Sequence, residues 1–242
     1  MEKSSVRTIG RLECRLLKLV LRLWFELRYR KHHAKLCLEK MGDLNLLVPP
    51  EVFNPKLFGS SSFLFKYLLQ HPIPPGIKVL DLGCGSGLLG IQLARRGARV
   101  IATDINPEAV WATAVNAQLN ACQPSLEVRQ GSLFAPVAAE SEKFDLVVLN
   151  PPYYAGIPDT PLEQAFRAGP ALEVLTAMLA GTCEVLKPQG RALAVLSSTI
   201  PLAHSWKAVE EVGLSWQPVA QRRYWAEWHL IYEIRPAKST FN

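Results

Sequence analysis

Residues 78–90, Lys-Val-Leu-Asp-Leu-Gly-Cys-Gly-Ser-Gly-Leu-Leu-Gly, decide the fold of this chain. A short apolar run over 78–82 ends in glycines at every second position, and a second apolar stretch follows. The pattern is typical of a buried strand, a sharp turn and a helix that we expect over 87–96. Bare main chain at the turn and free amide groups at the helix start favour the binding of a ligand there.

Strands and helices alternate on both sides of this unit. We expect a helix at 60–70, with Ser60, Ser61 and Ser62 as candidates for its N-cap. Further strands are expected at 99–104, 126–130, 144–149 and 192–197, helices at 107–120, 170–186 and 202–212, and a closing antiparallel pair at 219–225 and 229–234. This order predicts an α/β fold: a Rossmann-like, seven-stranded, mostly parallel sheet with helices on both faces and a C-terminal antiparallel hairpin.

Composition places the chain among globular proteins. It has 242 residues, of which 49% are hydrophobic and 20% charged, which excludes a disordered chain, a collagen and a disulfide miniprotein. The five cysteines include no Cys-x-x-Cys pair, so we expect reduced thiols, a cytoplasmic location and no metal site. No stretch is apolar for long enough to span a bilayer, and we expect no signal peptide.

The positive charge gathers at the N-terminus. Residues 1–40 hold eleven basic and four acidic side chains, a balance of +7, whereas the remaining residues balance to −1. Residues 11–27 read as an amphipathic helix with a basic stripe. We therefore predict a basic arm and linker at 1–50, a catalytic domain at 51–238 and a tail at 239–242. The arm either packs on the domain or binds an anionic partner, RNA or a membrane surface.

Two carboxylates accompany the glycine turn. Asp81 precedes it and is suited to an ammonium group, while Asp104 ends the next strand and is suited to the two hydroxyls of a ribose. Gly85, Gly87 and Gly90 also match the dinucleotide fingerprint, with Asp104 nineteen positions after Gly85. A nicotinamide cofactor is thus an alternative. Asp81 favours a cofactor with a positively charged amino acid end, because a carboxylate repels a pyrophosphate.

The stretch Asn150-Pro-Pro-Tyr153 follows the strand at 144–149 and so faces the same edge of the sheet. The Asn150 side-chain oxygen and the Pro151 carbonyl can accept two hydrogens of a planar nitrogen, and Tyr153 can stack on its plane. Pro151 and Pro152 stiffen the turn. Such a clamp aims the nitrogen lone pair at an electrophilic methyl by orientation and electrostatics.

With these motifs, residues 78–153 resemble the class I S-adenosylmethionine-dependent methyltransferases, in particular the HemK/PrmC-like amino methylases that carry Asn-Pro-Pro-Tyr. The resemblance implies that Asn150, Pro151, Pro152 and Tyr153 hold the target. It implies cofactor contacts from eleven residues: Asp81, Gly83, Cys84, Gly85, Ser86, Gly87, Asp104, Ile105, Ser132, Leu133 and Asn150. Ser132 stands where the family often has an acid, and the arm is shorter than the helical domain of glutamine methylases.

The resemblance implies methyl transfer from S-adenosylmethionine to a planar amide or amine nitrogen, with a protein glutamine as the preferred acceptor. Methylation of an adenine amine in RNA is the alternative. A nicotinamide-dependent oxidoreductase and a non-catalytic binding module are alternatives of other classes.

If RNA is the acceptor, activity should fall steeply with salt, because basic side chains that bind phosphates release counterions. It should fall again when Arg11, Arg15, Lys18 and Arg22 are replaced by alanine. Methyl transfer to RNA measured across a salt series checks both effects. Unchanged activity in both assays would exclude the arm from RNA binding.

Overall fold

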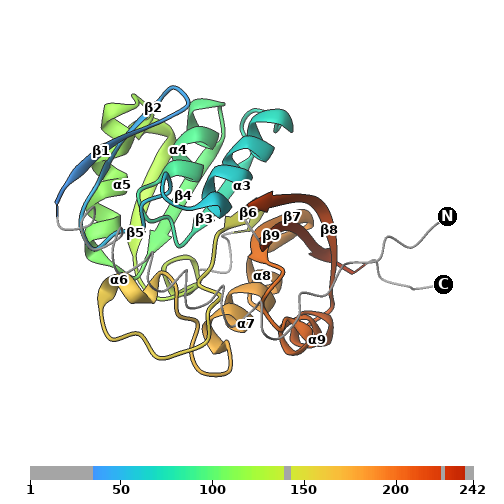
Figure 1. Ribbon diagram of the computed structural model, residues 1–242. Helices are drawn as coiled ribbons and strands as arrows, with labels where there is room; N and C mark the ends of the chain where they lie inside the picture. Colours follow the sequence, from blue (N-terminus) through green and yellow to red (C-terminus); the bar gives the residue numbers. More distant parts are fainter. Residues whose placement is uncertain (1–34, 139–142, 225–226, 238–242) are drawn as a thin grey trace.

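A computed structural model describes residues 35–138, 143–224 and 227–237 (Figure 1). The predicted helix at 11–27 lies outside these residues. The strands are β1 (Cys37–Met41), β2 (Leu44–Val48), β3 (Lys78–Leu82), β4 (Arg99–Asp104), β5 (Leu126–Gln130), β6 (Phe144–Leu149), β7 (Leu186–Ser197), β8 (Leu214–Tyr224) and β9 (Glu227–Pro236). The α-helices are α3 (Gly59–Gln70), α4 (Leu88–Arg95), α5 (Pro107–Leu119), α6 (Pro161–Gln164), α7 (Glu173–Ala180), α8 (Thr182–Val185) and α9 (Ala203–Glu211).

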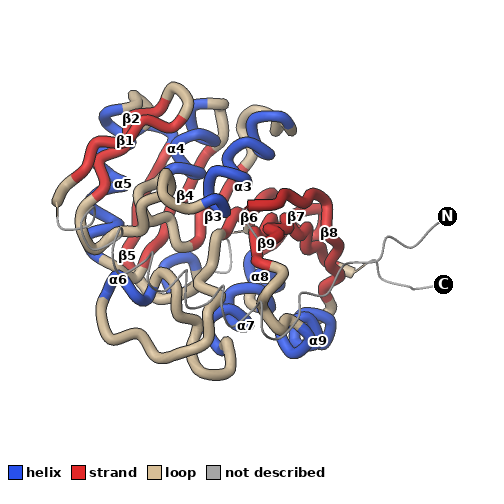
Figure 2. The backbone as a smooth tube through the Cα atoms, in the orientation of Figure 1, coloured by secondary structure: helices blue, strands red, loops and turns tan. Residues whose placement is uncertain are grey.

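The main sheet has seven strands in the order β5-β4-β3-β6-β7-β9-β8. The first five are parallel, and β9 pairs antiparallel with both β7 and β8. Figure 2 draws the strands in red and the helices in blue. The predicted fold class is therefore confirmed. The predicted bounds of β3 to β6 match the structure. Strands β3, β4 and β6 are buried along most of their length and carry apolar runs, whereas β5 at the edge of the sheet is mostly half-buried or exposed.

Helices cover both faces of this sheet (Figure 1). One apolar core lies under α3, α4 and α5, and a second lies under α7, α8 and α9. The predicted helix at 170–186 is instead two short helices that meet at Gly181, where a Cβ would lie 2.4 Å from the Phe134 ring. Strand β7 begins at Leu186, earlier than predicted, with a register shift against β6.

The register of three parallel strands determines where the polar motifs lie. Leu82, the last residue of β3, is paired with Thr103 of β4 and with Leu149 of β6. The next residue in each chain segment, Gly83 after β3, Asp104 at the end of β4 and Asn150 after β6, therefore lies at one level of the carboxyl edge of the sheet.

Part of the predicted linker is folded. Residues 37–48 form the β1–β2 hairpin, whose Leu44, Leu46 and Val48 are buried in the core beneath α5. Interpreting this stretch as linker was wrong because an isolated hairpin carries no periodic signal that reveals which helix it will pack against. The boundaries of the domain as a whole stay a prediction.

Two asparagines of α5 fasten the hairpin. The Asn116 amide accepts from Leu47 N and donates to Leu47 O, and the Asn120 amide does the same with Asn45. The spacings match, because four helical residues rise about 6 Å and two strand residues about 6.8 Å. The helix thus supplies the pairing groups that a neighbouring strand would otherwise offer.

The two cap predictions had opposite outcomes. Asn106 caps α5 as predicted, since its side chain accepts from Glu108 N and Pro107 occupies the first turn. The N-cap of α3 is Phe58, which makes no side-chain cap bond, so the prediction for Ser60 to Ser62 was wrong. No helix within the described residues is long and apolar enough to cross a membrane.

Asn116→Ala should destabilise the fold by about 3 kcal/mol, because it leaves main-chain groups of the half-buried Leu47 and the buried Ser86 without partners. Gln118→Ala, on the exposed side of the same helix, is the matched control and should change stability by no more than about 0.5 kcal/mol. Urea unfolding measures both. Equal effects of the two variants would contradict this role of Asn116.

Candidate cofactor and acceptor site

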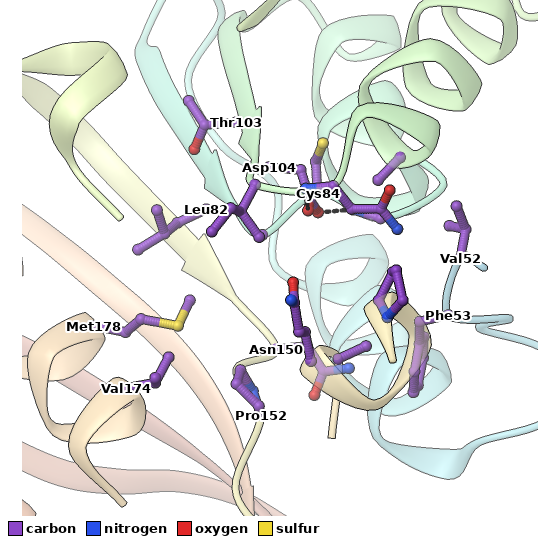
Figure 3. Close-up of a pocket in the computed structure, with 18 of the residues that line it drawn as sticks. Val52, Phe53, Leu82, Cys84, Thr103, Asp104, Asn150, Pro152, Val174 and Met178 are labelled. Carbon is purple, nitrogen blue, oxygen red and sulfur yellow. Dashed lines mark hydrogen bonds between the residues drawn. The ribbon is translucent and has the colours of Figure 1, made fainter. Parts of the chain in front are cut away.

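A cavity of about 480 Å³ opens at the carboxyl edge of the sheet (Figure 3). Its wall joins the turn after β3, the ends of β4 and β6, the start of α3, and α7. Nine of the eleven predicted cofactor residues line it: Asp81, Gly83, Cys84, Gly85, Ser86, Asp104, Ile105, Ser132 and Leu133. Asn150, the tenth, lines the same cavity, so the two predicted half-sites face one common space.

Asp81 is a buried carboxylate on β3, 1% exposed. Its Oδ2 accepts from Gly90 N in the first turn of α4 at 2.8 Å. Burial raises its pKa to about 7; the Gly90 bond opposes this rise and the charge of Asp104 adds to it. Burial makes the ionised form of Asp81 unfavourable, and a nearby positive charge would offset that cost. Asp81 is therefore a suitable partner for the ammonium group of an amino acid.

The glycine turn presents bare main chain to the cavity. Gly85 has φ +56°, and a Cβ built there would meet nothing within 4 Å. Gly87, the eleventh predicted cofactor residue, does not line the cavity. A Cβ at Gly87 would lie 2.8 Å from Ile91 and 2.9 Å from Thr113, so this glycine permits the close packing of α4 and α5.

Asp104 lies across the turn from Asp81 and is held rigidly. Its Oδ2 accepts from Gly85 N and its Oδ1 from Asn106 N, both at 2.9 Å. Burial raises its pKa above the ordinary value, and these main-chain donors oppose the rise. Each oxygen retains acceptor capacity, so the carboxylate fits a ribose diol.

Cys84 contributes surface to the site. Thr113 Oγ1 donates to its sulfur at 3.3 Å, and burial raises the pKa of the thiol well above its usual value. A protonated, buried thiol is a poor nucleophile. Cys84 therefore fills space beside the turn.

The side-chain amide of Asn150 has a hydrogen-bond partner at its nitrogen and none at its oxygen. Its Nδ2 donates to Ser61 Oγ at 2.8 Å, while its buried Oδ1 has no hydrogen-bond partner. Buried acceptors almost always have partners in folded proteins. An unpartnered oxygen in the wall of this cavity fits a ligand that carries an N–H group.

The other residues of the motif lie differently. Pro152 lines the cavity, as Figure 3 shows, but Pro151 and Tyr153 do not. The Tyr153 ring packs against the second core, 5.0 Å from that of Tyr154, and its hydroxyl is hydrogen-bonded to Ser60 and Tyr154. In this structure Tyr153 supports the turn from behind.

Several residues that line the cavity were not predicted from the sequence as site residues. Ser61 and Phe53 come from the N-terminal side of the domain, and Val174 and Met178 come from α7. Phe53 stacks on Phe58 with ring centroids 4.7 Å apart. The sequence gives no sign that these residues line the cavity, because contacts such as the Phe53–Phe58 stack form only once the chain has folded.

From the cysteine spacing we expect no metal site in this protein. Within residues 35–138, 143–224 and 227–237, no three His, Cys, Asp or Glu side chains gather in a way that would hold an ion.

Comparison with known proteins identifies the family. The model of the methyltransferase small domain family matches residues 43–214. A release factor glutamine methyltransferase of Aliivibrio fischeri is 36% identical over 116 residues, which cover 47% of this chain and 39% of the relative. A ribosomal RNA small subunit methyltransferase C of Chromohalobacter salexigens is 35% identical over 130 residues, which cover 53% of this chain and 34% of the relative.

A solved structure of similar fold is the 16S rRNA methyltransferase of T. thermophilus in complex with AdoMet and guanosine. It has a TM-score of 0.62 and 22% identity, and the match covers 83% of this chain and 50% of that one. At this identity the likeness concerns the fold. The chain spans well under half the length of the two curated relatives above.

The fold and the glycine turn with its two carboxylates define a class I S-adenosylmethionine-dependent methyltransferase domain. The chain belongs to the methyltransferase small domain family. The family favours S-adenosylmethionine over the nicotinamide cofactor that the glycine spacing also allowed.

Asp81→Asn should stabilise the chain without cofactor above pH 7 and leave it unchanged near pH 4. The folded carboxyl titrates at about 7 and the unfolded one near 3.8, so the folded state binds the proton more tightly and stability is lost as pH rises between these values. Melting temperatures at pH 4 and pH 8 test this, with the exposed Asp159→Asn as control.

The same substitution should weaken binding of S-adenosylhomocysteine in calorimetry, because the site would lose the carboxylate that we predict to face the ammonium group. Parallel melting curves for the two variants across pH, or unchanged affinity in Asp81→Asn, would contradict the role assigned to Asp81.

Proposed function

We propose that this protein transfers a methyl group from S-adenosylmethionine to a planar amide or amine nitrogen, with a protein glutamine side chain as the preferred acceptor. One observation carries the proposal: Asn150, whose buried Oδ1 has no hydrogen-bond partner, lines the same cavity as Asp81, Asp104 and the glycine turn.

One group of residues in the cavity binds the methyl donor, and a second group binds the methyl acceptor. When bound, S-adenosylmethionine supplies an electrophilic methyl carbon attached to a sulfonium. Asp81 holds its ammonium group, Asp104 its ribose hydroxyls, and Ile105 and Leu133 pack on its base. The main chain at Gly83–Ser86 allows the close approach.

Asn150 prepares the acceptor. Its Oδ1 accepts one hydrogen of the target nitrogen. The Pro151 carbonyl accepts the other; Pro151 itself does not line the cavity, but its carbonyl is joined by the peptide bond to Pro152, which does. Two acceptors draw the nitrogen toward tetrahedral geometry and free its lone pair, which is delocalised in a resting amide. The carbon–sulfur bond breaks as the carbon–nitrogen bond forms, and the methylated nitrogen releases one proton to water. No strong base is required.

Adenine in RNA is a second candidate acceptor. Phe53 lies in the cavity wall. Its ring stacks on Phe58 and also contacts Phe166, whose ring centroid is 5.4 Å from that of Phe53. Aromatic faces of this kind stack on nucleobases. The two curated relatives described above carry names of both acceptor classes, glutamine and ribosomal RNA.

The protein incubated with methyl-labelled S-adenosylmethionine should label a glutamine-containing peptide, and an adenine-containing RNA oligomer serves as the competing probe. Asn150→Ala should lower transfer by about 100-fold, because it removes an acceptor used in the transition state. Its affinity for S-adenosylhomocysteine should fall far less, because Asp81, Asp104 and the glycine turn remain. A variant that transfers at the wild-type rate, or a wild type that labels neither probe, would contradict the proposal.

A further inference from the structure

Helix α3 begins with three consecutive serines that do not cap it. Ser60, Ser61 and Ser62 lie in its first turn, after an extended Phe58 that makes no side-chain cap bond. Serine is a poor residue for a helix interior, since its hydroxyl competes for main-chain groups. Ser60 and Ser61 are nevertheless buried, 2% and 6% exposed. Their hydroxyls therefore need partners elsewhere in the fold.

Each buried serine bonds one residue of the Asn-Pro-Pro-Tyr motif. Ser61 Oγ accepts from Asn150 Nδ2 at 2.8 Å, across 89 positions of sequence. Ser60 shares a hydrogen bond with the Tyr153 hydroxyl. Ser62 points away and donates to the Pro55 carbonyl. The two ends of the motif are thus held by adjacent side chains of one helix.

We propose that Ser61 and Ser60 are positioning residues for methyl transfer, with Ser61 orienting the Asn150 side-chain amide and Ser60 fixing the end of the turn through Tyr153. This inference rests on the proposed function, since it assigns Asn150 Oδ1 to the acceptor nitrogen.

The orientation of an amide decides whether it helps or hinders this reaction. With Nδ2 bonded to Ser61, the acceptor atom Oδ1 remains for the cavity. Turned by half a rotation, the amide would present its two N–H donors to a target nitrogen that also carries hydrogens. Such a pair cannot form a hydrogen bond. Ser61 therefore acts through Asn150, even though it also lines the cavity.

The far end of the motif is anchored to the antiparallel part of the sheet. Tyr153 is also hydrogen-bonded to Tyr154, and the Glu227 carboxylate of β9 lies close enough to act electrostatically on both rings. Glu227 in turn accepts from Ser197, the last residue of β7, and from Thr199. A set of hydroxyls and the Glu227 carboxylate thus joins α3, the motif and two strands, which limits rotation of the turn.

Ser61→Ala tests the orientation directly, with Ser62→Ala as the matched control on the same turn. In the isotope-labelled full chain, the side-chain amide protons of Asn150 are assigned by comparison with Asn150→Ala. They should show a nuclear Overhauser contact to the Ser61 methylene in the wild type and in Ser62→Ala. In Ser61→Ala the amide signal should shift and exchange faster with water. This measurement needs no acceptor.

Kinetics supply the second readout, with whichever probe the wild type labels, glutamine peptide or RNA oligomer. Ser61→Ala should lower kcat by about 10-fold or more relative to Ser62→Ala, because small misplacements of a catalytic group cost large factors. Its affinity for S-adenosylhomocysteine should change less than about twofold, and its melting temperature should match that of Ser62→Ala. A merely structural role would lower the melting temperature and leave kcat unchanged.

Ser60→Ala should lower kcat by no more than Tyr153→Phe, which also removes the bond to Tyr154. The double variant should match Tyr153→Phe, because Ser60 acts through the bond that both substitutions remove. Additive effects would contradict the Ser60 assignment. Equal kcat in Ser61→Ala and Ser62→Ala, or Asn150 amide protons that contact groups other than Ser61, would overturn the Ser61 assignment. A wild type that labels neither probe would instead contradict the proposed function, and the resonance measurement would still decide the orientation.

Discussion

The parallel pairing of β3 with both β4 and β6 is the constraint on which the site depends. Leu82 is level with Thr103 on one side and with Leu149 on the other. Parallel strands in register end together, so the groups that follow them converge without any long loop. Gly83 N and Cys84 N both donate to Thr103 O, which binds the turn to the neighbouring strand. A slip of one residue in either pairing would separate Asp104 or Asn150 from the glycine turn.

The two faces of the sheet make different contributions to the cavity. The face that carries α4 and α5 holds the glycine turn, and it is bound to the β1–β2 hairpin through Asn116 and Asn120. The opposite face supplies an apolar wall, Val174 and Met178 of α7. Polar groups thus come from strand ends and apolar surface from a helix, which suits a ligand with a charged end and a flat ring.

The residues of the Asn-Pro-Pro-Tyr motif are adjacent in sequence but face different parts of the structure. Asn150 and Pro152 face the cavity, whereas Tyr153 lies behind them among Ser60, Tyr154 and the second core. An aromatic side chain beside an amide clamp suggests stacking, so the sequence predicts that the Tyr153 ring lies on the plane of the acceptor group. The structure turns that ring to the rear, where its hydroxyl finds buried partners. Only the packing of α3 against the turn could reveal this.

What the sequence by itself determined was local: the strand–glycine–helix unit, the parallel sheet, the Asn106 cap, and the two carboxylates and Asn150 at strand ends. These follow from periodicity and from φ-permissive glycines, which act over a few residues. The tertiary structure decided the roles of Ser60 and Ser61, the docking of residues 37–48 on α5, and the position of Tyr153. A serine or asparagine can bond to whichever buried group lies near it, and that neighbour is fixed by contacts between segments up to 89 positions apart.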